Sequence, residues 1–99
     1  MIRGTTPPIT ITVLEELGLE NTDTAFLTFE QNGENVLEKT LEDISIDSNS
    51  FICQLSQQET LAFSVGQLYF QLRFRIAGQA YATPKFIETV YDVIKDGVI

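Results

Sequence analysis

Two pairs of adjacent carboxylates, Glu15-Glu16 and Glu42-Asp43, are the residues of this sequence that could carry acid–base chemistry. Such reactions need two carboxylates that converge on one substrate, and adjacent residues rarely do so. We therefore interpret both pairs as solvated loop charges. Histidine is absent, which excludes the usual catalytic triad, and no Ser-x-x-Lys spacing offers a substitute. The sequence predicts that the protein is not an enzyme.

Motifs for metals and cofactors are equally sparse. Cys53 is the single cysteine, so neither an internal disulfide nor a cysteine-cluster zinc site can form, and its alternating surroundings predict a buried, inert thiol. Asp43, Asp47 and Asn49 are close in sequence but lack the terminal bidentate glutamate of a calcium loop. The glycines form neither a GxGxxG nor a P-loop pattern. We expect no metal and no cofactor.

The residues best suited to bind a partner lie on a long predicted strand over residues 67–76. Apolar residues alternate there with Tyr69, Arg73 and Arg75, and successive side chains of a strand point to opposite faces. The apolar set should face a core, and the other set should face solvent or a partner. We select Tyr69, Arg73 and Arg75, together with Tyr91 further along the chain, as a candidate interface.

The formal net charge of −8 is distributed unevenly. Residues 15–47 hold ten acids and one base, Lys39, whereas residues 51–99 hold four of each. An acidic surface repels phosphates, so nucleic acid is not an expected partner. The acids either keep the surface soluble or let the two halves present opposite charges to neighbouring copies. We expect Arg73 and Arg75 to pair with acids such as Glu38 on a neighbouring strand, or with an acidic patch of another subunit.

Short alternating segments between turn signals predict the elements that must position these residues. We expect strands over 9–13, 24–31, 35–41, 44–46, 51–55 and 67–76, and a last strand over 80–94 that breaks near Pro84. Asn32-Gly33 predicts a tight hairpin, and the capping-box spacing of Ser56 and Glu59 predicts one helical turn near 57–62. Residues 14–23 are expected to form a loop, with a helical turn as the alternative. Residues 97–99 either fray or dock on the domain or a neighbour.

About seven strands and no long helix predict one domain over residues 1–99, an all-β, immunoglobulin-like sandwich of two sheets. A small barrel is the main alternative. The helical turn should mark a crossing between the sheets. No apolar run approaches the roughly 20 residues of a membrane span, and the opening residues lack the apolar stretch of a signal peptide. We therefore expect synthesis in a cytoplasm and no membrane partner.

Most of the chain resembles small structural proteins encoded in the tail regions of phages and prophages, and the segment from Asp43 to Val93 resembles the N-terminal sandwich domain of phage baseplate upper proteins. The residues that carry the resemblance to the baseplate proteins are Asp43-Ile44-Ser45-Ile46, the strand 51–55, the turn Ser56-Gln57-Gln58-Glu59-Thr60-Leu61, the strand Gly66-Gln67-Leu68-Tyr69-Phe70-Gln71-Leu72, and Thr83, Phe86 and Val90. The small phage proteins are similar in the opening Ile2-Arg3-Gly4-Thr5-Thr6-Pro7 and in the hairpin Gln31-Asn32-Gly33 followed by residues 36–43.

This resemblance implies a non-enzymatic structural or accessory protein of a phage or prophage particle, in its tail or baseplate region. Such a protein would be made in the bacterial cytoplasm and become part of the virion. Its partners would be other phage structural proteins or further copies of itself in a homo-oligomer. Baseplate upper proteins continue into receptor-carrying segments, whereas this sequence stops at Ile99, which favours an accessory or decoration component.

A second hypothesis assigns the chain to a different class, the ligand-binding sandwich modules of carbohydrate or adhesin type. In such a module Tyr69, Tyr81 or Tyr91 would stack on a sugar ring. Tryptophan is absent, and the opening residues show no secretion signal. Both features favour the structural protein over the binding module.

Overall fold

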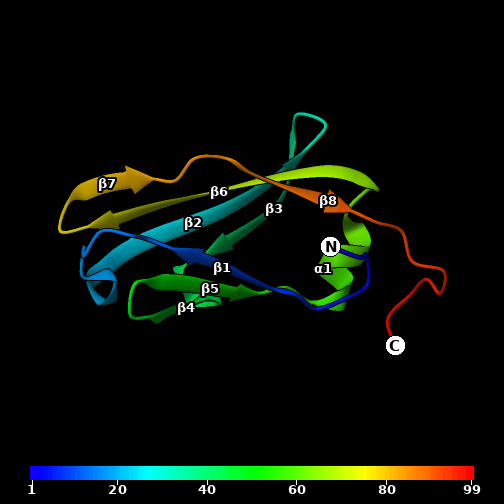
Figure 1. The fold of residues 1–99 in the computed structure, drawn as a ribbon, viewed down its shortest axis with the longest axis horizontal. Coiled ribbons are helices and arrows are strands. Elements are labelled where there is room, and N and C mark those ends of the chain that lie inside the picture. The colour runs from blue at the N-terminus through cyan, green and yellow to red at the C-terminus, as the bar shows by residue number, and fades with distance from the viewer.

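Two antiparallel sheets form a sandwich in the computed structural model, which describes residues 1–99 (Figure 1). The smaller sheet has the order β1-β5-β4, with β1 at Pro8–Thr12, β5 at Ser50–Gln54 and β4 at Ile44–Asp47. The larger sheet contains β3 (Glu34–Thr40), β2 (Thr22–Gln31), β6 (Gly66–Ile76), β7 (Gln79–Ala82) and β8 (Phe86–Val90). The predicted all-β sandwich is confirmed, and the separate sheets differ from the barrel alternative.

The last predicted strand is divided into β7 and β8, which share one edge of β6. β7 pairs with residues 73–76 of β6 and β8 with residues 66–70. Between them the Thr83 amide donates to the Leu72 carbonyl at 2.9 Å, and the Thr83 hydroxyl accepts from the Leu72 amide at 3.1 Å. Pro84 has no amide to continue this ladder. The predicted break is confirmed, and the sandwich has eight strands instead of seven.

The expected continuation of this strand to residue 94 is wrong. Val90 pairs with Gly66, the first residue of β6, so the next residues have no strand beside them on that side. Tyr91 instead makes an isolated parallel bridge with Ile2. A ladder cannot extend beyond the end of its partner, whatever the alternation of the sequence.

Turns and caps form where the local sequence requires them. Asn32 and Gly33 join β2 to β3 with φ of 55° and 78°, the left-handed pair that a type I′ hairpin needs. The helix α1 (Gln57–Ala62) begins with the predicted capping box, in which the Glu59 amide donates to Ser56 Oγ and the Ser56 amide donates to Glu59 Oε1. It links β5 to β6 and crosses between the sheets, as expected.

The other two crossings use short 3₁₀ turns. η1 (Leu19–Asn21) lies between β1 and β2, and η2 (Leu41–Asp43) lies between β3 and β4. The segment 14–23 is thus mainly loop, although β2 begins at Thr22, earlier than expected. β2 and β3 form a hairpin within one sheet, whereas the second and third strands of antibody domains belong to different sheets.

The core lies between the sheets and uses the predicted inward face of β6. Leu68, Leu72 and Phe74 are at most 5% exposed, and Phe70 is half-buried against the same cluster. Phe51 of the smaller sheet contacts Phe74 of the larger one, with ring centroids 4.9 Å apart. The cluster of buried apolar residues is Ile11, Leu19, Ala25, Leu27, Phe29, Ile44, Phe51, Cys53, Leu55, Phe63, Leu68, Leu72, Phe74, Ile76 and Val90. The cysteine is therefore buried, as predicted.

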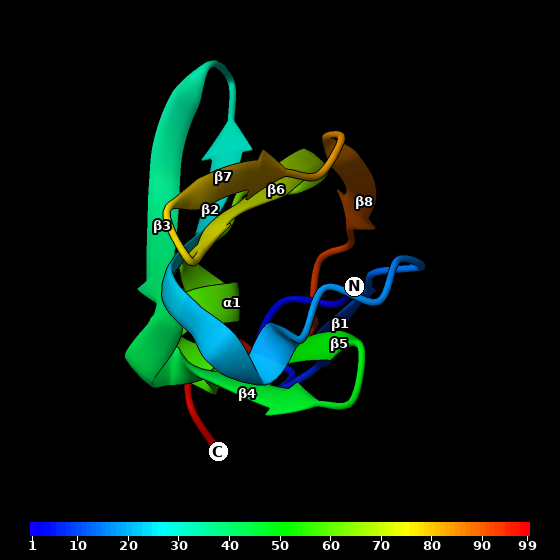
Figure 2. The ribbon, with the colours of Figure 1, turned by 90° about the vertical axis from the view of Figure 1, so that its left-hand side faces the viewer.

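The helix α1 closes one end of the sandwich (Figure 1), and Figure 2 shows it between the two layers. Phe63, which ends the helix, is 2% exposed and contacts Phe29, with ring centroids 5.8 Å apart. The helix is only six residues long, and no helix of the protein is long and apolar enough to cross a membrane. The outward face of β6 is left without any covering element, and most of the candidate interface residues lie there.

Candidate interaction surface

Arg73 and Arg75 lie side by side on the outer face of the larger sheet. Both are exposed, and the residues next to them in the chain, Leu72 and Phe74, face the core. The antiparallel register places Phe26 of β2 opposite Arg73, so this aromatic ring belongs to the same outer face. The predicted outward orientation of both arginines is confirmed.

These side chains surround an open depression of about 200 Å³, which we call the arginine hollow. Its lining residues are Thr24, Phe26, Arg73, Phe74, Arg75, Ala80 and Tyr81. Phe26 is 42% exposed, an unusual position for an aromatic side chain on the polar side of a strand. The hollow therefore combines exposed apolar surface with two guanidinium groups.

The expected pairing with Glu38 is wrong. Glu38 is on β3, and β2 lies between β3 and β6, so its carboxylate is two strands from the arginines. It accepts a hydrogen bond from the Thr28 hydroxyl at 3.2 Å. Arg75 instead has its Nε atom 3.9 Å from Asp23 Oδ2, at the outer limit of an ion pair, and Arg73 makes no ion pair.

Tyr69 is on the same outer face but lines a second, polar depression of about 180 Å³, the tyrosine hollow. The lining residues of the tyrosine hollow are Thr28, Glu30, Asn35, Tyr69, Phe70, Gln71 and Lys85. The Tyr69 hydroxyl donates to Gln67 Oε1 at 2.8 Å, and Lys85 lies 3.6 Å from the Glu30 carboxylate. This hollow offers hydrogen-bonding groups beside the Tyr69 ring.

Tyr91 is not part of this surface. It follows β8, is 59% exposed and lines neither hollow. The structure thus brings Arg73 and Arg75 together, places Tyr69 in the neighbouring hollow and leaves Tyr91 apart. Phe26 was missed from the sequence, although its place between the inward residues Ala25 and Leu27 already indicated an outward aromatic.

A third depression, the edge cleft, opens where the β1 side of the sandwich faces β7 and the start of β8. It has a volume of about 240 Å³, and its apolar lining includes Ile11, Val13, Leu17, Tyr81, Pro84 and Phe86. Tyr81 stacks on Phe74 there, with ring centroids 5.2 Å apart. This ring stacking leaves Tyr81 half-buried.

The loop after β1 carries a strongly exposed apolar residue. Leu14 is 93% exposed and is followed by Glu15 and Glu16, which are also exposed. We call these three residues the acidic loop. Leucine is normally buried, whereas the sequence alone indicates only solvated loop charges at Glu15 and Glu16. The combination of one projecting leucine with two carboxylates becomes apparent only in the structure.

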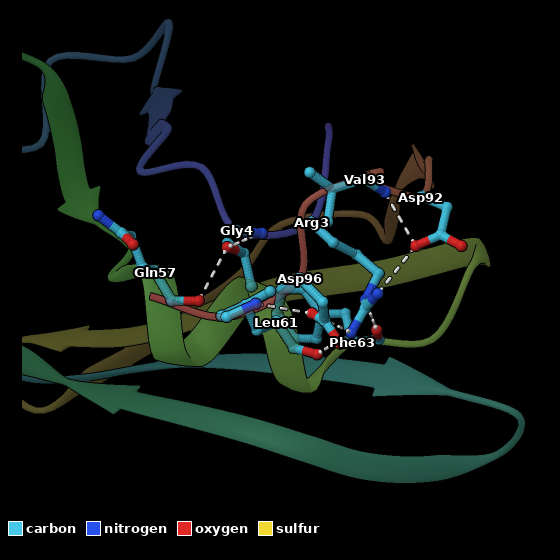
Figure 3. Close-up of polar contacts among 10 residues, drawn as sticks. Arg3, Gly4, Gln57, Leu61, Phe63, Asp92, Val93 and Asp96 are labelled. Atoms are coloured by element: carbon cyan, nitrogen blue, oxygen red, sulfur yellow. Dashed lines mark hydrogen bonds and ion pairs between the residues drawn. The ribbon is translucent and has the colours of Figure 1, made fainter. Parts of the chain in front are cut away.

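Polar contacts at the other end of the molecule converge on Arg3 (Figure 3). Its Nη2 and Nε atoms donate to the carbonyls of Leu61 and Phe63, at 2.8 and 3.1 Å, where the helix α1 ends. Its Nη1 atom donates to Asp92 Oδ1 at 2.8 Å, and Asp96 lies 3.7 Å from Nη2. A hydrogen bond from the Val93 amide, together with Arg3, lowers the pKa of Asp92. We call this arrangement the Arg3 clasp.

The segment beside Arg3 is fixed by further contacts to α1. The Gly4 amide donates to Thr60 Oγ1 at 3.0 Å, and the Thr60 hydroxyl donates to the Thr5 carbonyl at 2.7 Å. Gly4 has φ of +81°, and a Cβ atom there would lie 3.2 Å from Leu61 Cδ2, so this position favours glycine. The Gln57 side chain exchanges hydrogen bonds with the backbone of Ile99, and residues near 99 therefore dock on the domain.

An ion pair between Lys39 of β3 and Glu59 of α1 joins the helix to the edge of the larger sheet. Burial opposes the charge of both groups, but their mutual hydrogen bond outweighs it, so the pKa of Lys39 is raised and that of Glu59 is lowered. Hydrogen bonds with Ser56 also lower the pKa of Glu59. Burial raises the pKa of the nearby Cys53 thiol.

No protein-family model and no curated protein sequence matches this chain. No group of three or more cysteine, aspartate and glutamate side chains gathers at a position that could hold a metal ion. The physical features of the surface are therefore the basis for a functional interpretation, together with the resemblance described above. Two features differ clearly from the rest of the surface. One is the exposed outer face of the larger sheet. The other is the end around α1, where side-chain hydrogen bonds join segments that are distant in the sequence.

Proposed function

We propose that this chain is a non-enzymatic structural or accessory protein of a phage or prophage particle. It would be made in the bacterial cytoplasm and incorporated into the tail or baseplate region of the virion. It would act through contacts with other phage structural proteins or with further copies of itself. The resemblance to phage tail proteins supports the assignment to a particle, and the sandwich fold is compatible with it.

The arginine hollow is the observation that carries the proposal. Protein interfaces are enriched in aromatic residues and arginine, with the apolar contacts at the centre and charged groups around them. Phe26 is 42% exposed between the two strands that flank it, and Arg73 beside it has no acidic partner within the chain. An exposed ring and an unpaired guanidinium on one sheet face are best explained by a protein that covers them.

The decisive experiment detects the protein in particles. We would induce the prophage of the encoding bacterium, purify the particles by density-gradient centrifugation, and measure the protein by mass spectrometry and by immunogold electron microscopy. We expect it to band with the tail proteins at a constant ratio, while an abundant cytoplasmic protein is lost. If the protein is expressed but absent from intact particles, the proposal is wrong.

The tyrosine hollow favours a second function, a ligand-binding module of carbohydrate or adhesin type. Asn35, Gln71 and Lys85 surround the Tyr69 ring, and an aromatic face within a ring of hydrogen-bonding groups suits a sugar. A glycan array would compare the natural protein with the Tyr69→Ala variant, and Tyr91→Ala would be the control because Tyr91 lies outside the hollow. Binding that only Tyr69→Ala abolishes would favour this function, and an array without any binding would dismiss it.

A further inference from the structure

We infer that the acidic loop of one copy, Leu14-Glu15-Glu16, docks into the arginine hollow of a second copy of this chain. The inference rests on the proposed function, because it names the partner of the surface on which that proposal depends. It follows from three structural observations: an exposed leucine in the acidic loop, an exposed aromatic side chain in the arginine hollow, and opposite charges around the two.

The apolar parts of the two surfaces complement each other. Leu14 is 93% exposed, so nearly the whole side chain is in water. The arginine hollow offers Phe26, 42% exposed, and the exposed Ala80 as its apolar lining. Inserting a leucine between these side chains would remove apolar surface of both copies from water, which is the main driving force of association.

The charged parts complement each other as well. Glu15 and Glu16 form no ion pair, and neither does Arg73, while Arg75 reaches its single carboxylate only at 3.9 Å. Arg73 and Arg75 stand about 7 Å apart along one face of the strand, and two adjacent glutamates on a loop can reach both. Of the other four bases, Arg3, Lys39 and Lys85 are each paired with an acid of their own chain, and Lys95, near the end of the sequence, forms no ion pair. The charges left unpaired are thus of opposite sign on the two surfaces.

The geometry places this contact between copies and not within one chain. Glu15 and Leu17 line the edge cleft, and no residue of the acidic loop lines the arginine hollow. In Figure 2 the loop after β1 projects sideways from the edge of the sandwich, away from the outer face of the larger sheet. The two surfaces differ, so the contact is either made twice in a two-fold pair or repeated head to tail in a row.

One such contact is small, and we expect it to be weak in solution and strengthened where many copies are held side by side. The test is therefore sedimentation equilibrium of the purified protein at concentrations up to about 1 mM and low salt, where surface charges are least screened. We expect concentration-dependent association that weakens as salt is added. A protein that stays monomeric throughout this range would overturn the inference.

Charge reversal identifies the surfaces. Arg73→Glu/Arg75→Glu and Glu15→Lys/Glu16→Lys should each weaken association by about tenfold or more, because like charges would then face each other. A mixture of the two variants should regain association, since each variant keeps one natural surface. The variant with all four substitutions should also associate, because the charges oppose again. Failure of both restorations would overturn the inference.

Matched controls change the charge by the same amount elsewhere. Lys85→Glu/Lys95→Glu should leave association unchanged, as should Glu34→Lys/Glu42→Lys, because none of these residues lies in the acidic loop or the arginine hollow. If the controls weaken association equally, net charge and not a docked loop is responsible, and the inference is wrong. Circular dichroism melting curves would show that every variant is folded.

A cross-link measures the contact independently of charge. Leu14→Cys/Ala80→Cys should form intermolecular disulfides under mild oxidation, whereas Leu14→Cys/Gln58→Cys, with the second thiol far from the hollow on α1, should not. Cys53 is 1% exposed and would not interfere. Equal cross-linking of both variants would contradict the docked loop.

The inference and the proposed function can fail separately. If the protein is present in particles but does not self-associate, the inference alone is wrong. If it self-associates but is absent from particles, the proposed function alone is wrong.

Discussion

Arg3 and Arg73 show how differently two ends of the molecule use the same side chain. Arg3 is 19% exposed at its side chain and donates to two backbone carbonyls and a carboxylate of its own chain. Arg73 is exposed, lies beside an uncovered phenylalanine and has no acidic partner. The first arginine closes the fold around α1, and the second forms no ion pair within its own chain, as the proposed interface requires.

The difference extends to the polar groups around each arginine. At the α1 end, the side chain of Gln31 is 4% exposed and exchanges hydrogen bonds with the backbone of Ser64, at 2.8 and 2.9 Å. Removing one partner there leaves a buried group unsatisfied, which is costly. The polar groups around the arginine hollow are solvated and lose little when a neighbour is removed. Stability should therefore depend on the α1 end, and association on the outer face.

The largest expected contrast is between two phenylalanines of β2. Phe29 is fully buried, with its ring centroid 5.8 Å from that of Phe63 and 5.6 Å from that of Phe70. Phe29→Ala should lower the free energy of unfolding by about 3–5 kcal/mol through the cavity that it leaves. Phe26→Ala, on the outer face of the same strand, should change it by about 0.5 kcal/mol or less. Urea denaturation of both variants measures the contrast, and similar losses would contradict the division between core and free surface.

The second contrast is between the arginines themselves. Arg3→Ala should cost about 2–3 kcal/mol, because the carbonyls of Leu61 and Phe63 lose a charged donor. Arg3→Lys should recover less than half of this, since a single ammonium cannot reproduce the planar fork. Arg73→Ala should stay within about 0.5 kcal/mol of the natural protein. Equal costs for Arg3→Ala and Arg73→Ala in thermal and urea unfolding would refute the separate roles.

Much of the sandwich could be predicted from the sequence because its signals are local. The alternation along β6, the Asn32-Gly33 turn and the Ser56–Glu59 capping box each depend on a few neighbouring residues, and all three formed as expected. The outward orientation of Arg73 and Arg75 followed directly from the alternation. The alternation of apolar and polar residues along a strand therefore indicates which of its faces is exposed to solvent.

The wrong predictions concern features that depend on which strands are neighbours in the sheets. Glu38 was wrong as the partner of the arginines because β2 separates β3 from β6. The strand predicted up to residue 94 ended at Val90 because β6 offers no further partner. In the Arg3 clasp, Arg3 contacts Leu61 and Asp92, which are 58 and 89 positions away in the sequence. No local sequence pattern predicts such contacts. The arginine hollow likewise became visible only when the register placed Phe26 opposite Arg73.

A smaller effect is expected from pH at the ion pair of Lys39 with Glu59. The pKa of Glu59 is lowered in the folded protein, because its bonds to Lys39 and Ser56 outweigh burial. The stabilisation is therefore complete above the unfolded glutamate value of about 4.3 and is lost as pH falls through the lower folded value. The pKa of Lys39 is raised, so its contribution persists below about 10.4 and is lost as pH rises through the higher folded value.

Glu59→Gln isolates this ion pair, because glutamine can keep the reciprocal bond of the capping box. At pH 7 we expect the variant to be about 1 kcal/mol less stable than the natural protein. The difference should shrink as pH falls below the ordinary glutamate value, where the natural carboxylate also becomes neutral. Urea denaturation from pH 3 to 8 provides the measurement. A difference that stays constant with pH would show that the substitution acts through packing and not through charge.

The smallest expected effect on stability is at Arg75, an arginine of the outer face that, unlike Arg73, has a weak ion pair within its own chain. The side chains of Arg75 and Asp23 are 53% and 46% exposed, and their atoms are 3.9 Å apart, so water screens their attraction. Arg75→Gln should change the free energy of unfolding by about 0.5 kcal/mol or less. The same substitution should weaken self-association, because it removes one of the two guanidinium groups that face the acidic loop. A loss of stability above about 1 kcal/mol would instead make Arg75 part of the fold, as Arg3 is, and the outer face would no longer be a surface reserved for partners.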